Sequence, residues 1–81
     1  MGGIFLNNHD LKLLKKVGEG IRRERDRNGL TQAQLAEEAS LHPNFIGQIE
    51  RGEKAATVTS LHKICTALGI GVGDFFDQIG L

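Results

Sequence analysis

Residues 31–52 decide the fold and read TQAQLAEEASLHPNFIGQIERG. Thr31 and Gln34 have the spacing of a capping box, in which each side chain satisfies a free backbone amide at a helix start. The helix that they open is short and covers residues 32–39. After a brief turn comes Pro43, which suits the first position of a helix because no N–H donor is needed there. The stretch therefore predicts two short helices in close succession.

The second of these helices starts at Pro43 and ends at Gly52. Two helices joined by a tight turn cross at a steep angle when the residues at their junction are small. Ala36 and Ala39 meet that requirement, and Leu41 fills the space between the helices. The second helix then stands out from the body of the domain and is narrow enough to enter the major groove of DNA.

The flanking sequence predicts three further helices. A long helix covers about residues 8–28, and a fourth begins at Thr57 or Thr59 and ends at Gly69. A short final helix covers about residues 72–79. The pattern predicts an all-α fold with five helices and no strands.

Glycines punctuate this pattern. Gly29, followed by the apolar Leu30, predicts a left-handed end to the first helix. Gly18 and Gly20 lie inside that helix, where each costs about 1 kcal/mol relative to alanine. They predict either a kink or a close approach of another backbone.

Length and composition indicate a single small domain. The chain has 81 residues, and ten basic residues balance ten acidic ones. We assign residues 8–81 to the domain and residues 1–7 to a flexible or partner-bound arm. The neutral balance counts against a nucleic-acid binder unless the basic residues gather on one face. A lone cysteine, Cys65, excludes an internal disulfide and is expected in the core.

Several classes of protein are not supported by the sequence. No residues have the spacing of metal ligands, so we expect no metal and no cofactor. No arrangement typical of a catalytic site is present, and we do not expect an enzyme. No segment is apolar and long enough to span a membrane, and the lone cysteine fits a reducing cytoplasm.

The sequence resembles the Cro and phage-repressor helix-turn-helix family, also called the XRE family. Three segments match it in order, namely IRRxR at 21–25, GLTQxxLA at 29–36 and FIxxIERG at 45–52. The resemblance covers about residues 20–76. It implies a compact domain like that of lambda repressor, in which the second and third helices form the helix-turn-helix and bind double-stranded DNA.

The resemblance also implies roles for individual positions. Gln32 matches a residue that binds a backbone phosphate, which agrees with the tendency of helix N-termini to bind anions. Arg25 and Glu50 match an ion pair that links the first helix to the third, and we expect a structural role for it. Where such a pair is deeply buried, loss of one partner costs about 3–5 kcal/mol.

Asn44 and Gln48 are the predicted base-reading residues. They lie four residues apart and share one helix face, and amide side chains make paired hydrogen bonds to adenine. His42 has a second interpretation, as a cap of the third helix. The full set predicted to bind DNA is Gln32, His42, Asn44, Phe45, Gln48, Arg51 and Lys54. Three departures from the family pattern leave this set less defined: Pro43, Gly47 and the pair Ala55-Ala56.

The final helix is predicted to form a dimer interface, because it carries more large apolar residues than one small body covers. The residues concerned are Val72, Phe75, Phe76 and Ile79. The favoured function is a homodimeric transcriptional regulator on a pseudo-palindromic operator, with a restriction-modification controller as the preferred subtype. The alternatives are an antitoxin or adaptor that mainly binds another protein, and an interaction domain without DNA binding.

Overall fold

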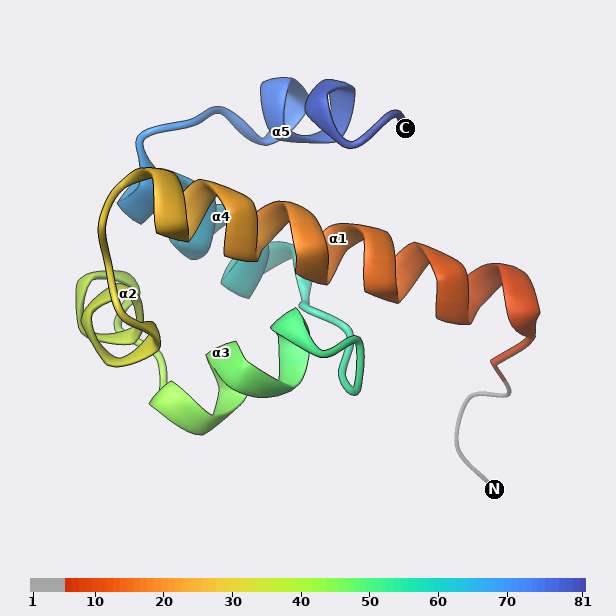
Figure 1. The fold of residues 1–81 in the computed structure, drawn as a ribbon, viewed down its shortest axis with the longest axis horizontal. Coiled ribbons are helices and arrows are strands. Elements are labelled where there is room, and N and C mark those ends of the chain that lie inside the picture. The colour runs from red at the N-terminus through yellow and green to blue at the C-terminus, as the bar shows by residue number, and fades with distance from the viewer. Residues whose placement is uncertain (1–5) are drawn as a thin grey trace.

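The computed structural model describes residues 6–81, which form five helices (Figure 1). They are α1 (Asn8–Arg27), α2 (Gln32–Ala39), α3 (Pro43–Glu50), α4 (Val58–Leu68) and α5 (Val72–Gln78). No strand occurs in this part of the chain, so the predicted all-α class is confirmed. In Figure 1, α1 crosses the molecule with α5 above it and α2 and α3 below. No helix within residues 6–81 has the length and apolar character needed to cross a membrane.

The start of α1 is fixed by a capping box. The Asn7 side chain accepts from the Asp10 backbone N–H at 2.9 Å, and the Asp10 carboxylate accepts from the Asn7 N–H at 3.2 Å. Asn7 was assigned to the predicted arm and is the N-cap of the helix in the structure. Residues 1–5, the rest of that arm except Leu6, lie outside the described residues.

Gly18 and Gly20 bring α1 close to the rest of the fold. A Cβ at Gly18 would stand 2.3 Å from the carbonyl oxygen of Ile49 and 2.6 Å from that of Glu50. A Cβ at Gly20 would stand 2.5 Å from the Cγ2 of Ile79. Helix α1 is continuous through both glycines. The predicted close approach of another backbone is therefore confirmed at Gly18, whereas Gly20 makes room for side chains.

The other helix ends follow local signals in the sequence. Gly29 and Gly69 both have positive φ, of 68° and 72°, as expected of residues that follow a helix in the left-handed conformation. Of the two candidate caps for α4, Thr57 is the one used, since its side chain accepts from the Ser60 N–H at 3.0 Å. Helix α5 ends at Gln78, one residue before the predicted end.

One apolar core holds the helices together, and α1 to α5 all contribute to it. Its fully buried members include Ile21, Leu35, Ile46, Ile49, Ile64, Cys65 and Phe75. Each large side chain buried in this way contributes about 2 kcal/mol of transfer free energy. Ile46 and Ile49 hold α3 by one side, and the opposite side of that helix remains available to other molecules.

Candidate functional site

The turn between α2 and α3 is built from short-range hydrogen bonds. Thr31 and Gln34 form the predicted capping box at the start of α2, with distances of 3.1 and 2.8 Å. At its end, Ser40 has a φ of 57° and is the only residue other than glycine with positive φ among residues 6–81. His42 Nδ1 then accepts from the Asn44 N–H at 3.1 Å. His42 therefore caps α3, as its second interpretation proposed.

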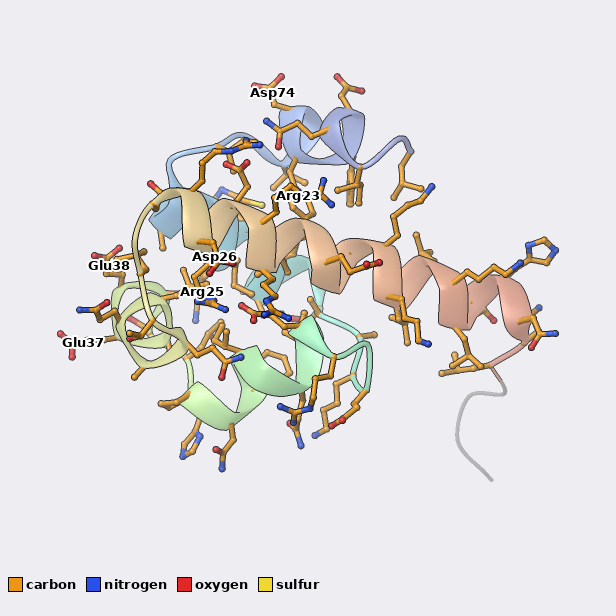
Figure 2. All side chains as sticks on the ribbon, in the orientation of Figure 1. Arg23, Arg25, Asp26, Glu37, Glu38 and Asp74 are labelled. Atoms are coloured by element: carbon orange, nitrogen blue, oxygen red, sulfur yellow. The ribbon has the colours of Figure 1, made fainter. Side chains whose placement is uncertain are left out.

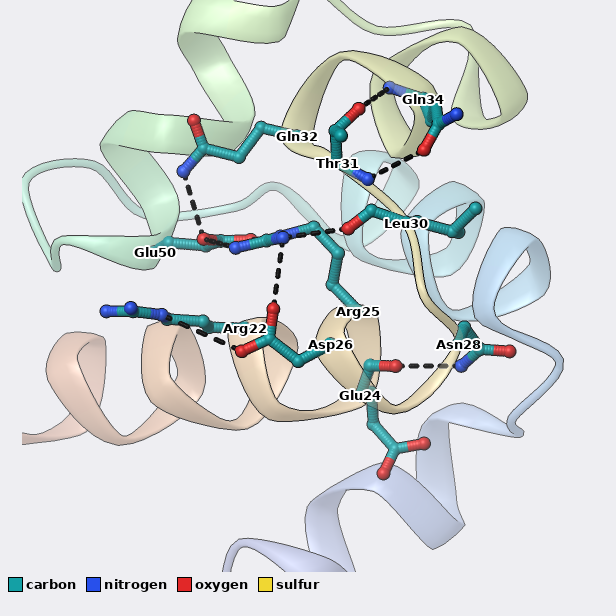
Figure 3. A network of polar contacts seen from close by, with 10 residues as sticks. All are labelled: Arg22, Glu24, Arg25, Asp26, Asn28, Leu30, Thr31, Gln32, Gln34 and Glu50. Atoms are coloured by element: carbon teal, nitrogen blue, oxygen red, sulfur yellow. Dashed lines mark hydrogen bonds and ion pairs between the residues drawn. The ribbon is translucent and has the colours of Figure 1, made fainter.

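Arg25, Glu50 and Gln32 form a network that fixes α3 against α1 and α2 (Figure 3). The Arg25 guanidinium donates to the Glu50 carboxylate from Nε at 2.6 Å and from Nη2 at 3.0 Å. Its Nη1 donates to the carbonyl oxygen of Leu30 at 2.8 Å. Gln32 Nε2 donates to the same carboxylate at 3.0 Å. The ion pair that the resemblance implied is thus present, together with a third residue.

This network is largely shielded from solvent. The side chains of Arg25 and Glu50 are 11% and 3% exposed. The hydrogen bond to Glu50 raises the pKa of Arg25, although burial opposes this effect. Because both charges are satisfied, the C-terminal end of α3 is held at a fixed place beside α1. The exposed face of α3 is then presented in a defined orientation.

A shallow hollow lies where α2 meets the exposed face of α3. Its lining residues are Gln32, Ala33, Pro43, Asn44, Gly47, Gln48 and Arg51. A Cβ at Gly47 would stand 3.0 Å from Arg51 Nη1 and 3.3 Å from Gln32 Oε1. The absence of a side chain at Gly47 therefore gives these two polar groups room to converge. The hollow offers amide and guanidinium groups, which suit the base edges and phosphates of nucleic acid.

Arg51 is paired on this surface with Glu53. Its Nε and Nη2 donate to the two carboxylate oxygens of Glu53 at 2.8 and 3.2 Å. The side chains are 57% and 54% exposed. The hydrogen bonds between them raise the pKa of Arg51 and lower the pKa of Glu53. The sequence did not single out Glu53, and the only available signal was its position two residues after Arg51.

The seven residues predicted to contact DNA do not all lie together. Gln32, Asn44, Gln48 and Arg51 line the hollow. The other three have different surroundings. His42 caps α3, Phe45 is half-buried against the core, and Lys54 lines an apolar groove together with Leu13, Leu14, Val17 and Phe76.

None of the residues that line the hollow is acidic. Figure 2 shows Glu37 and Glu38 at the outer end of α2, and Asp74 on α5, across the molecule from α3. Glu50 faces inward and is neutralised by Arg25. On α1, Glu24 is only 7% exposed and forms an ion pair with Arg27. A net charge of zero is thus compatible with an α3 face whose hollow is lined by polar residues and one cation, Arg51.

The four predicted dimer-interface residues fall into two pairs. Phe75 and Ile79 are 0% and 7% exposed and complete the core of the single chain, so they are not on its surface. Their burial follows from Gly20, which lets α5 lie close to α1. Val72 and Phe76 are partly exposed and line an apolar groove with Val58, Thr59, Leu61 and His62. Val58 is 87% exposed and was not predicted.

Comparisons with known proteins agree on the nature of the domain. The family model HTH_3, described as helix-turn-helix, matches residues 21–75. Control protein C.SmaI of Serratia marcescens is 37% identical over 65 residues, which is 80% of this chain and 77% of that protein. Control protein C.BamHI of Bacillus amyloliquefaciens is 34% identical over 70 residues, 85% of this chain and 84% of that one.

A solved structure extends the similarity from sequence to three-dimensional structure. The restriction-modification controller protein C.AhdI from Aeromonas hydrophila superposes with a TM-score of 0.78 at 32% identity. The match covers 80% of this chain and 98% of that protein. The resemblance stated from three sequence segments is therefore confirmed.

Proposed function

This chain belongs to the helix-turn-helix family HTH_3 of transcriptional regulators and controller proteins, and we propose that it binds a pseudo-palindromic operator sequence-specifically as a homodimer. The observation that carries the proposal is the outer face of α3. There Asn44 and Gln48 share a hollow with Gln32 and Arg51, while Ile46 and Ile49 anchor the opposite side. Members of this family are regulators, and we assign no catalytic role to the chain.

On that face, some side chains are suited to contact base edges and others to contact the phosphate backbone of DNA. The amides of Asn44 and Gln48 can donate to N7 and accept from the N6 amino group of adenine in the major groove. Gln32 stands at the first position of α2, where free N–H groups and the helix dipole favour a phosphate. The Arg51 guanidinium at the end of α3 adds a second phosphate contact.

A homodimer is proposed through the apolar face formed by Val58, Leu61, Val72 and Phe76. Val58 is the most exposed member of this face at 87%, and it lies beside the partly exposed Val72 and Phe76, so apolar side chains gather here at the surface, as they do at interfaces. A second copy on the same face would give a two-fold axis. Two recognition helices about 34 Å apart would then meet successive major grooves on one side of the duplex.

The first test is selection of binding sites from a random duplex library at moderate salt, with the native mass of the protein measured alongside. We expect the native mass of a dimer and a selected DNA site with two-fold symmetry. Binding should weaken steeply as salt rises, because phosphate contacts release counterions. A well-folded protein that enriches no sequence would contradict the proposal.

Substitution of the proposed readers is the sharper test. Asn44→Ala combined with Gln48→Ala should abolish the sequence preference and leave salt-sensitive, non-specific binding in place. Asn8→Ala is the control, since it removes an exposed amide at the far end of α1. If the double variant still prefers the selected site, the assignment of these two readers is wrong.

The dimer face has its own test. Val58→Glu places a charge in the first turn of α4, where a carboxylate favours the helix, so the fold should persist. We expect this variant to be monomeric, as measured by sedimentation equilibrium. Leu11→Glu, at an exposed apolar position on α1, should remain dimeric. An unchanged dimer in the Val58 variant would place the interface elsewhere.

The restriction-modification controller subtype is favoured by the names of the relatives, and the cytoplasm is the proposed location because operator DNA lies there in bacteria. The alternative is an antitoxin or adaptor. It draws on the apolar groove beside α1, which is lined by Leu13, Leu14 and Val17 and shares Leu61 and Phe76 with the proposed dimer face. A stable complex with a different protein, with no enrichment of any DNA site, would favour this alternative.

A further inference from the structure

Arg51 is the cation that lines the proposed DNA-binding hollow, and an acidic residue of the same chain is bound to it. Glu53 accepts from two of its guanidinium nitrogens, Nε and Nη2, in a bidentate arrangement. Carboxylates and phosphates are recognised by the same fork of guanidinium donors. A phosphate contact through that fork therefore requires Glu53 to leave first.

The Arg51 side chain has a defined orientation in the structure. Its third nitrogen, Nη1, lies over Gly47, at 3.0 Å from where a Cβ would stand. Arg51 is thus folded back along α3 into the hollow that contains Asn44 and Gln48. Glu53 holds it from the side of the following loop. That loop is itself ordered, since the Glu53 N–H donates to the Gln48 carbonyl oxygen at 2.8 Å.

We propose that Glu53 competes with DNA phosphate for Arg51 and thereby lowers the affinity of the protein for duplex DNA. The inference rests on the proposed function, because it concerns the same surface. It assigns to Glu53 a role that opposes DNA binding, separate from base reading and from stabilisation of the fold. Both partners are more than half exposed, so the pair is weak enough to open when DNA arrives.

A parallel arrangement occurs at Gln32 but has a different outcome. Gln32 is also engaged by a carboxylate, that of Glu50 at 3.0 Å, yet Glu50 is buried and bound to Arg25. Removal of Glu50 would disturb the fold. The Glu53 side chain is 54% exposed, and it can be changed without this complication. It is therefore the position at which the effect of competition is separable from stability.

The test measures the binding of a short duplex of mixed sequence to the full-length protein by fluorescence anisotropy at low salt. Glu53→Gln should bind about threefold to fivefold more tightly than the unaltered protein, the size expected from loss of an exposed ion pair. Glu37→Gln is the matched control, because it changes the net charge equally at the outer end of α2 (Figure 2). Thermal unfolding should show both variants as stable as the starting protein.

A double variant separates competition from simple charge repulsion. In the Arg51→Gln background, Glu53→Gln should gain no more affinity than Glu37→Gln does. An equal gain with and without Arg51 would show that Glu53 only repels phosphate, and would overturn the inference. Weaker binding by Glu53→Gln would also overturn it, since the carboxylate would then be positioning Arg51 for DNA. Absence of binding by every variant would instead reject the proposed function, and the inference with it.

Discussion

At Gly18 a single hydrogen atom determines how closely two helices approach. The carbonyl oxygens of Ile49 and Glu50 would lie within 2.6 Å of any Cβ placed there. Both are backbone atoms at the end of α3, so neither can rotate away as a side chain would. The requirement for glycine thus comes from packing and not from backbone conformation.

Gly18→Ala should therefore destabilise the protein although alanine is the better helix former. We expect a loss of about 3 kcal/mol in the free energy of unfolding, typical of an overpacked site that cannot relax. Gly73→Ala is the control, because a Cβ there meets nothing within 4 Å. It should be neutral or stabilising by up to about 1 kcal/mol. Urea unfolding measures both, and equal values for the two variants would contradict the packing argument.

Prediction from sequence worked at this scale where the cause was local. Thr31, Gln34 and Gly29 act through neighbours a few residues away, and their roles were predicted from spacing alone. Gly18 was predicted only as one of two possibilities, because its neighbour comes from another helix. The bond between Arg51 and Glu53 was missed, since two adjacent exposed charges do not reveal whether their side chains meet.

Between elements, the orientation of α3 depends on the buried pair of Arg25 and Glu50. The pair joins α1 to α3, and Gln32 adds a bond from α2 to the same carboxylate. Three helices therefore share one charged group that is 3% exposed. We therefore expect a change in this network to alter the orientation of α3.

Arg25→Met should be strongly destabilising, because it leaves the Glu50 carboxylate buried with only Gln32 to satisfy it. A loss of about 3–5 kcal/mol is expected for a stranded buried charge. The double variant with Glu50→Leu should recover much of that loss, since an apolar pair of similar volume needs no partner. Denaturant unfolding of the single and double variants provides the measurement. A double variant no better than Arg25→Met would show that the charge is not the cause.

Most helix bounds were predicted to within a residue, but α3 ends at Glu50 and not at the predicted Gly52, and the burial of α5 was not predicted. Thr31 and Thr57 begin α2 and α4, Gly69 ends α4, and each of these signals lies directly beside the helix that it bounds. The fate of Phe75 depends instead on how closely α1 and α5 approach, which is set by Gly20 more than 50 residues earlier. Apolar residues on a short terminal helix do not by themselves distinguish a core face from a partner face.

For the molecule as a whole, Cys65 offers a probe of cooperative unfolding. It is 1% exposed in the centre of the core, and burial raises the pKa of its thiol. Thiolates are the reactive form, so both effects protect it.

Alkylation of Cys65 should therefore require global unfolding. Native protein should react with iodoacetamide about a thousandfold or more slowly than protein in denaturant, in line with the stability of a small domain. Mass spectrometry of timed samples provides the measurement. Gly18→Ala should speed the reaction in proportion to its loss of stability. Rapid labelling of native protein would show that the region around α4 opens locally.

The two sides of α3 have separate duties, and this separation has a consequence for how such a domain can change. Ile46, Ile49 and Glu50 bind the helix to its frame, and Asn44 and Gln48 contribute nothing to the core. The two outward positions can therefore be substituted without altering the packing of the core. New pairs of side chains at these two sites can be screened in a living host against altered targets. Each variant that recognises an altered target would be a regulator that no longer acts on the original target, and the stability of its fold would be unchanged.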